Sequence, residues 1–201
     1  MSDPTPTPSP RRQELLERAY RYALRNGLAE LSLRPLATAI ESSPRVLLFL
    51  FGSKDELVRA LLARARADER ALLARVRADT ARRDLPTVVR TTWQWLVEPA
   101  HRPLLTLWLE AYGRSLTEPA GPWADFARQT VDDWLGILAA AQAPARRRGR
   151  AAAAERTLAL AVLRGALLDL LATGDTGRAG GAVELYLRLA DRPTALGRGR
   201  A

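Results

Sequence analysis

The sequence predicts an all-α protein of about nine helices. Apolar residues recur at helical spacing along most of the 201-residue chain, and alternating apolar and polar runs, which would indicate strands, extend over only a few residues. Proline and glycine divide the apolar stretches into segments of helical length. A chain of this length is expected to form one or two domains with cores of their own.

The composition excludes several classes of site. The chain has no cysteine and one histidine, His101, so disulfides, thiolate chemistry and multi-histidine metal sites are excluded, and we expect no metal and no cofactor. No run of about 18 residues is both apolar and uncharged, so neither a membrane span nor a signal peptide is expected. With 31 Lys and Arg against 22 Asp and Glu, the net charge of +9 makes nucleic acid the first partner to test.

The chain begins with a segment that is unsuited to regular structure. Residues 1–10 alternate proline with serine, threonine and aspartate, and are expected to form a disordered or extended arm. An apolar stripe then predicts a helix over 11–26, and Gly27 is placed to end it.

Two short helices follow, and each has its own start signal. Ser32 is placed to cap the first, with Pro35 in its first turn, and this helix is expected to end near residue 40. Ser43 and Pro44 repeat the pattern for the second, which Gly52 ends. Ser53 and Glu56 then form the pattern of a capping box at the start of a longer helix that runs to about residue 82. Further helices are expected over 87–98, 104–116, 123–142, 151–172 and 179–190.

Two short helices joined by about three residues, with a longer helix on each side, predict a helix-turn-helix. The sequence of this region carries three motifs: Gly27 after the first helix, LSLRPLA over 31–37, and FGSKDEL over 51–57. With these motifs, residues 11–66 resemble the DNA-binding head of the TetR family of bacterial transcriptional repressors. The resemblance implies a cytoplasmic, nucleoid-associated bacterial protein that binds double-stranded DNA.

The DNA contacts are expected at the starts of the helices and on the second short helix. Arg45 suits a bidentate contact with guanine, and the hydroxyls of Ser42 and Ser43 suit phosphate. The resemblance aligns Lys54 with a phosphate contact and Arg34 with a backbone or base contact. The expected DNA-binding residues are Arg34, Ser42, Ser43, Arg45, Val46, Leu48, Phe49 and Lys54.

The head also departs from the family pattern. Glu41 and Ser42 stand where the family usually has Gly-Val, and residues 48–50 read Leu-Phe-Leu where it has Tyr-His. The lost tyrosine removes a phosphate hydrogen bond, and Glu41 adds a negative charge near DNA. Leu48 and Phe49 can instead contact thymine methyl groups. We therefore expect an operator that differs from those of better-known members of the family, and a lower affinity for DNA.

Residues 67–201 are expected to form an effector-binding and dimerisation domain. All five tryptophans lie within 93–134, a region that suits a ligand cavity, although tryptophans at helical spacing also serve ordinary packing. The candidate lining residues are Trp93, Trp108, Tyr112 and Trp134.

The segment 157–172 is apolar nearly all round, which predicts burial on both faces. A dimer seam explains this, because a reader of palindromic DNA needs a two-fold axis; a central core helix of a monomer is the alternative. The expected dimer residues are Leu163, Leu167, Leu170, Leu185 and Leu189.

The sequence thus predicts a homodimeric repressor that binds a palindromic operator and is released by a small, largely apolar effector. The alternative is a helical ligand-binding or protein-interaction module with a degenerate DNA-binding head. No enzyme is expected, because no nucleophile and base pair is visible. Glu98 and His101 have the Glu-x-x-His spacing of di-iron sites, but such a site needs a second copy of this motif, which one histidine cannot supply.

Overall fold

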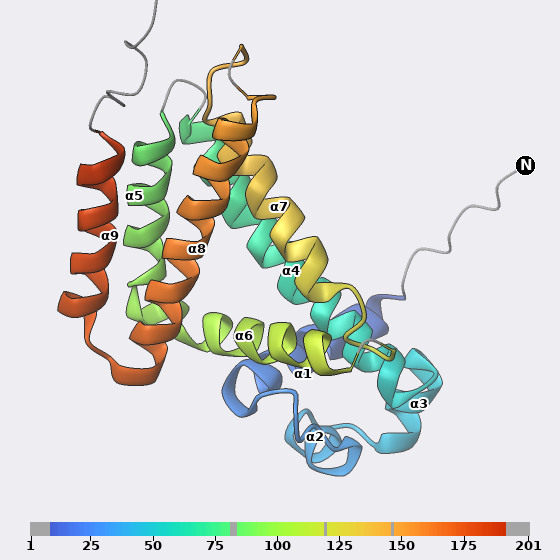
Figure 1. Ribbon diagram of the computed structural model, residues 1–201. Coiled ribbons are helices and arrows are strands. Elements are labelled where there is room, and N and C mark those ends of the chain that lie inside the picture. The colour runs from blue at the N-terminus through green and yellow to red at the C-terminus, as the bar shows by residue number, and fades with distance from the viewer. Residues whose placement is uncertain (1–8, 81–83, 119, 146, 192–201) are drawn as a thin grey trace, which may run out of the picture. The chain divides into compact units, whose positions relative to one another are not determined.

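The structure is a computed structural model that describes residues 9–80, 84–118, 120–145 and 147–191. Within these ranges it contains nine α-helices, one short 3₁₀-helix and no strand, so the all-α prediction is confirmed (Figure 1). The elements are α1 (Pro10–Asn26), α2 (Leu33–Ala39), α3 (Pro44–Phe51), α4 (Lys54–Thr80), α5 (Leu85–Leu96), η1 (Pro99–His101), α6 (Arg102–Thr117), α7 (Phe126–Ala140), α8 (Arg150–Thr173) and α9 (Thr176–Ala190).

Local capping signals explain where the first helices begin. Residues 1–8 of the expected arm lie outside the described residues, whereas Ser9 caps α1 through a hydrogen bond from the Arg12 N–H. Gly27 ends this helix at a φ of 78°, a left-handed value that glycine adopts without strain. At α4 the hydroxyl of Ser53 accepts from the Glu56 N–H, as a capping box requires, but the Glu56 carboxylate pairs with Arg59.

The contacts divide the chain into two compact units, and α4, α6 and α7 each contribute residues to both. Unit 1 comprises the described residues of 1–70 and 103–129. Its core is formed by apolar side chains of α1, α2, α3, α4 and α6, together with Trp123 and Phe126. The small core expected between the short helices is present, because Leu36, Ala37, Ile40, Leu47 and Phe51 are buried and Leu50 packs against them.

Polar contacts tie α1 to α4 within unit 1. The Tyr20 hydroxyl donates to Asp68 over 2.9 Å, and the Arg64 guanidinium donates to Glu17 over 2.6 Å while it lies over the Tyr20 ring. Burial and the Asp68 carboxylate raise the pKa of Tyr20, so the phenol stays a neutral donor. These contacts hold the middle of α4 against the first helix.

A carboxylate on α6 binds the turn after α1. Glu110 accepts hydrogen bonds from the backbone N–H groups of Leu28, at 2.9 Å, and of Ala29. A Cβ atom on Gly27 would lie 3.0 Å from the Glu110 carboxylate, so the turn and the carboxylate fit closely. Because these N–H groups follow the end of a helix, the carboxylate supplies the acceptor that the helix no longer provides.

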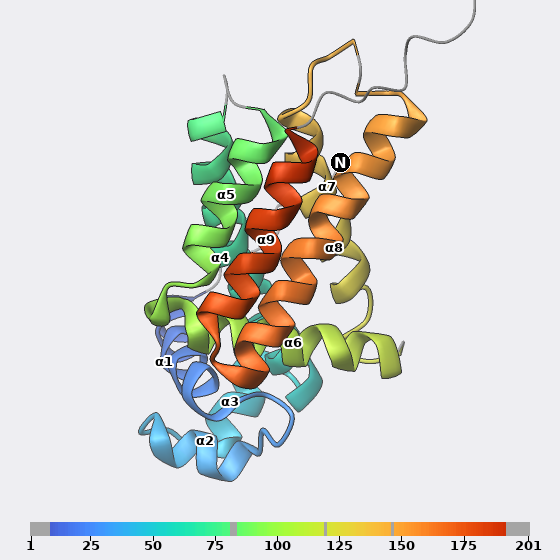
Figure 2. The same cartoon turned by 60° about the vertical axis from the view of Figure 1, so that its left-hand side comes forward.

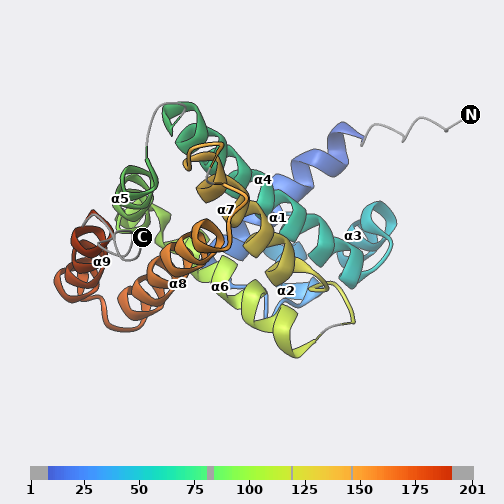
Figure 3. The same ribbon diagram turned by 45° about the horizontal axis from the view of Figure 1, so that its top comes forward.

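Unit 2 comprises the described residues of 71–102 and 130–191. Here α8 and α9 form an antiparallel pair joined by a short turn at Gly174, and α5 packs against both (Figures 2 and 3). Gly180 of α9 lies against the indole of Trp93 on α5. The buried side chains include Val88, Val89, Trp93, Leu138, Leu163, Val183 and Leu187.

Several helices differ from their predicted bounds for local reasons. α5 begins at Leu85, earlier than expected, because Asp84 caps it by accepting from the Thr87 N–H. A 3₁₀ turn over Pro99–His101 precedes α6, and α7 starts at Phe126 after Asp125, which has a φ of 62°. The functional division expected at residue 67 remains a prediction.

Candidate functional site

The second short helix of the head, α3, is fixed at both ends. The Ser43 hydroxyl accepts from the Val46 N–H over 3.2 Å, which caps the N-terminus. At the other end the Arg12 guanidinium donates to the Leu50 carbonyl over 3.2 Å and lies 4.8 Å from the centre of the Phe51 ring. The helix is therefore held in one orientation by contacts with α1.

The two faces of α3 differ sharply. Leu47 and Phe51, one turn apart, are buried in the core of unit 1. Successive residues of a helix are rotated by about 100°, so the residues on either side of Leu47 in the sequence point away from this buried face. This outer face of α3 consists of Arg45, Val46, Leu48 and Phe49, all exposed. Phe49 is the most exposed of its three apolar residues, at 86%, and lies one turn after Arg45 on the same ridge.

Four further DNA-contacting residues were predicted near α3. In the structure two of them are exposed cations, one is a helix cap and one has a buried hydroxyl. Arg34 and Lys54 are exposed in the first turns of α2 and α4, so both cations are accessible. The Ser43 hydroxyl serves as the cap of α3. The Ser42 hydroxyl is buried and has no hydrogen-bond partner among the described residues, so it is not available to a phosphate in this conformation.

Glu41, which stands where the resembling family has glycine, adopts the backbone conformation that glycine favours. Its φ is 55°, a left-handed value that is unfavourable for a side chain with a Cβ atom. Its carboxylate forms an ion pair with Arg18 of α1 at 2.5 Å. This pair, which the sequence pattern did not indicate, partly compensates the negative charge that Glu41 adds to the head.

The aromatic residues proposed for a ligand site fall into both units. Trp108 and Tyr112 lie on α6 in unit 1, with ring centroids 5.6 Å apart, and Trp108 packs against the core there. Its indole N–H is buried without an acceptor among the described residues. Trp93 and Trp134 are buried in unit 2.

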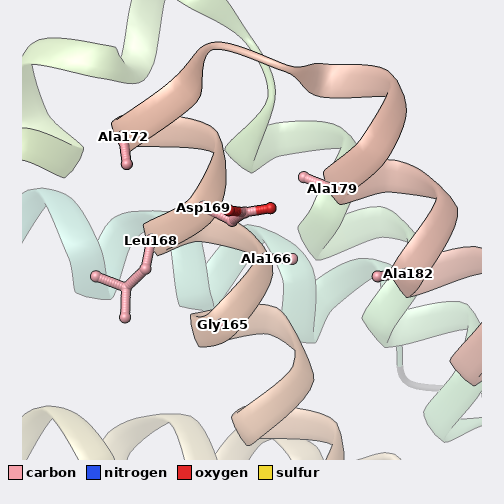
Figure 4. Close-up of a pocket in the computed structure, with 7 residues that line it drawn as sticks. All are labelled: Gly165, Ala166, Leu168, Asp169, Ala172, Ala179 and Ala182. Atoms are coloured by element: carbon pink, nitrogen blue, oxygen red, sulfur yellow. The ribbon is translucent and has the colours of Figure 1, made fainter.

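Two cavities lie along α8 and α9 in unit 2. The larger, of about 850 Å³, is lined by apolar side chains such as Leu158, Leu185 and Leu189, and by Asp84, Glu155 and Tyr186. Burial and the Glu155 carboxylate raise the pKa of Tyr186, which stays protonated. The smaller, of about 460 Å³, lies between the two helices beside Gly165 and Ala182 (Figure 4). Neither is lined by the four aromatic candidates.

The leucines expected at a dimer seam divide into two groups. Leu163, Leu167 and Leu170 are buried within this chain and have little surface left for a partner. Leu185 and Leu189 are exposed on α9.

The structure adds two exposed leucines on α8, Leu158 and Leu168. The four leucines 158, 168, 185 and 189 are between 48% and 56% exposed, and we call them the α8–α9 face. On α8 the exposed stripe repeats at intervals of three and four residues and is apolar throughout: Ala154, Leu158, Ala161, Gly165, Leu168 and Ala172. The stripe could not be predicted from the sequence, because a helix that is apolar on all sides shows no periodicity that would distinguish its exposed side from its buried side.

His101 has a packing role in this structure. Its ring stacks on Trp95 with centroids 3.9 Å apart, and its Nδ1 lies 2.9 Å from the Trp95 carbonyl oxygen. Across the described residues no group of three or more His, Cys, Asp or Glu side chains could hold a metal ion. In the same part of the chain no helix is long and apolar enough to cross a membrane.

Comparison with known proteins shows similarity at the level of structure. No family model and no curated protein matches the chain. The multidrug binding protein EbrR, solved with imidazole, is 26% identical, with a TM-score of 0.65 over 92% of this chain and 93% of its own. TetR-family regulators from Rhodococcus sp. and Haloarcula marismortui are each 19% identical, with TM-scores of 0.67 and 0.65.

These alignments extend along nearly the whole of each protein. The Rhodococcus match covers 89% of this chain and 100% of the other, and the Haloarcula match covers 90% and 96%. The chain therefore has the fold of TetR-family transcriptional regulators.

Proposed function

We propose that the protein is a homodimeric transcriptional repressor that binds a near-palindromic operator and is released by a small, largely apolar effector. The observation that supports it best is the arrangement of the head. A rigidly held α3 presents Arg45 to solvent, and the cations of Arg34 and Lys54 stand at the starts of the neighbouring helices. In a helix-turn-helix this second helix enters the major groove while the flanking cations contact phosphates.

The α8–α9 face supports the homodimer. Four half-exposed leucines on two adjacent helices form an apolar surface, and the small residues Ala161 and Gly165 between them let a second helix pair approach closely. An interface of this kind pairs the same patch on both copies about a two-fold axis. Two heads related by that axis reach half-sites about one helical turn of DNA apart.

The effector is proposed to bind at aromatic side chains of the predicted set, either Trp108 and Tyr112 in unit 1 or Trp93 and Trp134 in unit 2. EbrR, the similar protein, has been solved with imidazole, proflavin, ethidium and malachite green. An effector releases the operator only if it binds the state with wrongly spaced heads more tightly than the DNA-bound state. This difference in affinity, and not ligand binding as such, is the proposed cause of release.

The DNA proposal is tested by measuring affinity for DNA from upstream of the protein's own gene at several salt concentrations. Arg45→Ala is expected to weaken binding and relax sequence preference, and Lys54→Ala to weaken it uniformly and to reduce the salt slope by about one. Arg188→Ala, an exposed arginine on α9, is the matched control and should bind normally. Absence of salt-sensitive binding, with both head variants behaving like the wild type, would contradict the proposal.

A second candidate is a helical ligand-binding or protein-interaction module whose head no longer reads DNA. The outer face of α3 is the observation that favours it, because three of its four side chains are apolar and Phe49 is 86% exposed. Intrinsic tryptophan fluorescence distinguishes the two functions, because both predict a response to ligand and only the first predicts a response to DNA.

A further inference from the structure

We propose that the outer face of α3 selects its operator by the C5-methyl groups of thymine, with Phe49 as the main contact and Arg45 fixing an adjacent guanine. The inference rests on the proposed DNA-binding function and specifies which feature of the DNA is read. It concerns the three apolar members of that face, Val46, Leu48 and Phe49, which are all exposed.

The exposure of Phe49 has no explanation in the core of unit 1. Leu47 and Phe51 supply the buried face of α3, and Leu50 packs at its edge. Phe49 lies on the far side of the helix and leaves 86% of its surface in water, while Val46 and Leu48 flank it at 38% and 41%. A cluster of exposed apolar side chains on a short, capped helix marks a binding surface.

The chemistry of this face limits what it can read in a major groove. Among its four side chains only Arg45 carries hydrogen-bond donors, and none carries an acceptor. Three positions of this face therefore make no hydrogen bond to a base edge. The apolar group that base pairs display in the major groove is the thymine methyl, so Phe49, Val46 and Leu48 fit thymine.

The charges around the face favour DNA over an apolar protein surface as the occupant. Arg45 shares the outermost ridge with Phe49, and the exposed Lys54 and Arg34 stand at the starts of the adjacent helices. The nearby carboxylate of Glu41 is ion-paired with Arg18. An apolar strip bordered by cations matches the methyl groups of a groove bordered by phosphates.

The position of the face is fixed before binding. Ser43 caps the N-terminus of α3, and Arg12 holds its C-terminus through the Leu50 carbonyl and the Phe51 ring. A reader of methyl groups depends on such rigidity, because an apolar contact has no directional bond to correct a misplaced side chain.

The test uses an operator that the protein itself selects from a random library of DNA duplexes. In that operator each thymine is replaced in turn by deoxyuridine, which removes one methyl group and leaves base pairing intact. We expect one or two positions in each half-site to lose affinity by about fourfold when the methyl is removed, as burial of one such group implies. These positions should lie beside the guanine that Arg45 reads.

Protein variants then assign the contact. Phe49→Ala should abolish the largest deoxyuridine effect, since the side chain that senses that methyl group is gone, and should leave any smaller effect due to Val46 or Leu48. Arg45→Ala should lose affinity but keep the full deoxyuridine effect. Leu116→Ala, which removes an exposed leucine on α6, is the matched control and should retain both affinity and the effect.

Each outcome decides between the two proposals. Salt-sensitive binding that is unchanged by deoxyuridine at every position overturns the methyl reading and leaves the repressor proposal standing. If the largest deoxyuridine effect persists undiminished in Phe49→Ala, the assignment to Phe49 is also overturned. Failure to select any duplex contradicts the proposed function itself. Because the first arm alters only the DNA, it does not depend on the folding of any variant.

Discussion

At the scale of single residues, Glu41 shows a local conflict between sequence and backbone. The turn between α2 and α3 requires a left-handed residue, and a glutamate occupies it at a φ of 55°. Its ion pair with Arg18 is exposed on the glutamate side, and such pairs contribute between about 0 and 1 kcal/mol. The strain of a left-handed side chain is about 1 to 2 kcal/mol, so the pair does not fully compensate it.

The protein should therefore be more stable with glycine at position 41 than with alanine. Glu41→Gly and Glu41→Ala both remove the ion pair, so their difference isolates the backbone. We expect the glycine variant to unfold with a free energy about 0.5 to 1 kcal/mol higher, because relief of strain exceeds the entropy that glycine adds to the unfolded chain. Urea denaturation of the two variants measures this, and an alanine variant of equal or greater stability would show that the turn is unstrained.

Glu110 is a second residue whose role depends on its partners in space. Its carboxylate accepts from the N–H groups of Leu28 and Ala29, and Leu28 is buried. Glu110→Ala leaves these donors without an acceptor, and we expect it to lower the free energy of unfolding by about 1 to 3 kcal/mol. Glu184→Ala, on the exposed surface of α9, should change it by less than about 0.5 kcal/mol. Equal effects in urea denaturation would contradict this role.

At the scale of elements, α5 illustrates how a helix start couples stability to pH. Hydrogen bonds from the hydroxyl and the backbone N–H of Thr87 hold the pKa of Asp84 below its usual range. A carboxylate with a lowered pKa in the folded state stabilises it fully above the unfolded pKa of about 4, and this contribution is lost as the pH falls through the folded value. The cap is therefore strongest near neutral pH.

Substitutions at Asp84 should show directly that the stabilisation by the cap decreases as the pH falls. At pH 7 we expect Asp84→Ala to lower the free energy of unfolding by about 1 kcal/mol and Asp84→Asn, which keeps a capping oxygen, by less. At pH 3 the difference between the wild type and either variant should shrink. Thermal unfolding at the two pH values measures it, and a constant difference would mean that the carboxylate charge contributes nothing.

At the scale of the whole molecule, the α8–α9 face predicts the oligomeric state. Leu185→Glu places a charge in the proposed interface, and burial of an unpaired charge opposes association. We expect this variant to sediment as a monomer where the wild type sediments as a dimer, and to lose affinity for a two-half-site operator. Leu116→Glu, a similarly exposed leucine on α6, should remain dimeric. A dimeric Leu185→Glu would place the interface elsewhere.

Much of the helical layout was readable because its signals are local. Ser43 with Pro44 and Gly52 marked α3 within a residue, and Gly27 marked the end of α1. The start of α5 has the same kind of capping pattern, with Asp84 before Leu85 and Pro86, although the apolar periodicity alone predicted a start at residue 87. The 3₁₀ turn over Pro99–His101 was not predicted, although Pro99 stands at its first position.

The sequence by itself determined the bounds of the two short helices of the helix-turn-helix, because the serine, proline and glycine signals at their ends act locally. Tertiary structure decided the rest. It decided which apolar side chains of α3 and α8 are buried, and it joined Glu110 to Leu28 across 82 residues of sequence. These outcomes depend on contacts between distant segments, and local periodicity carries no information about which segments will meet.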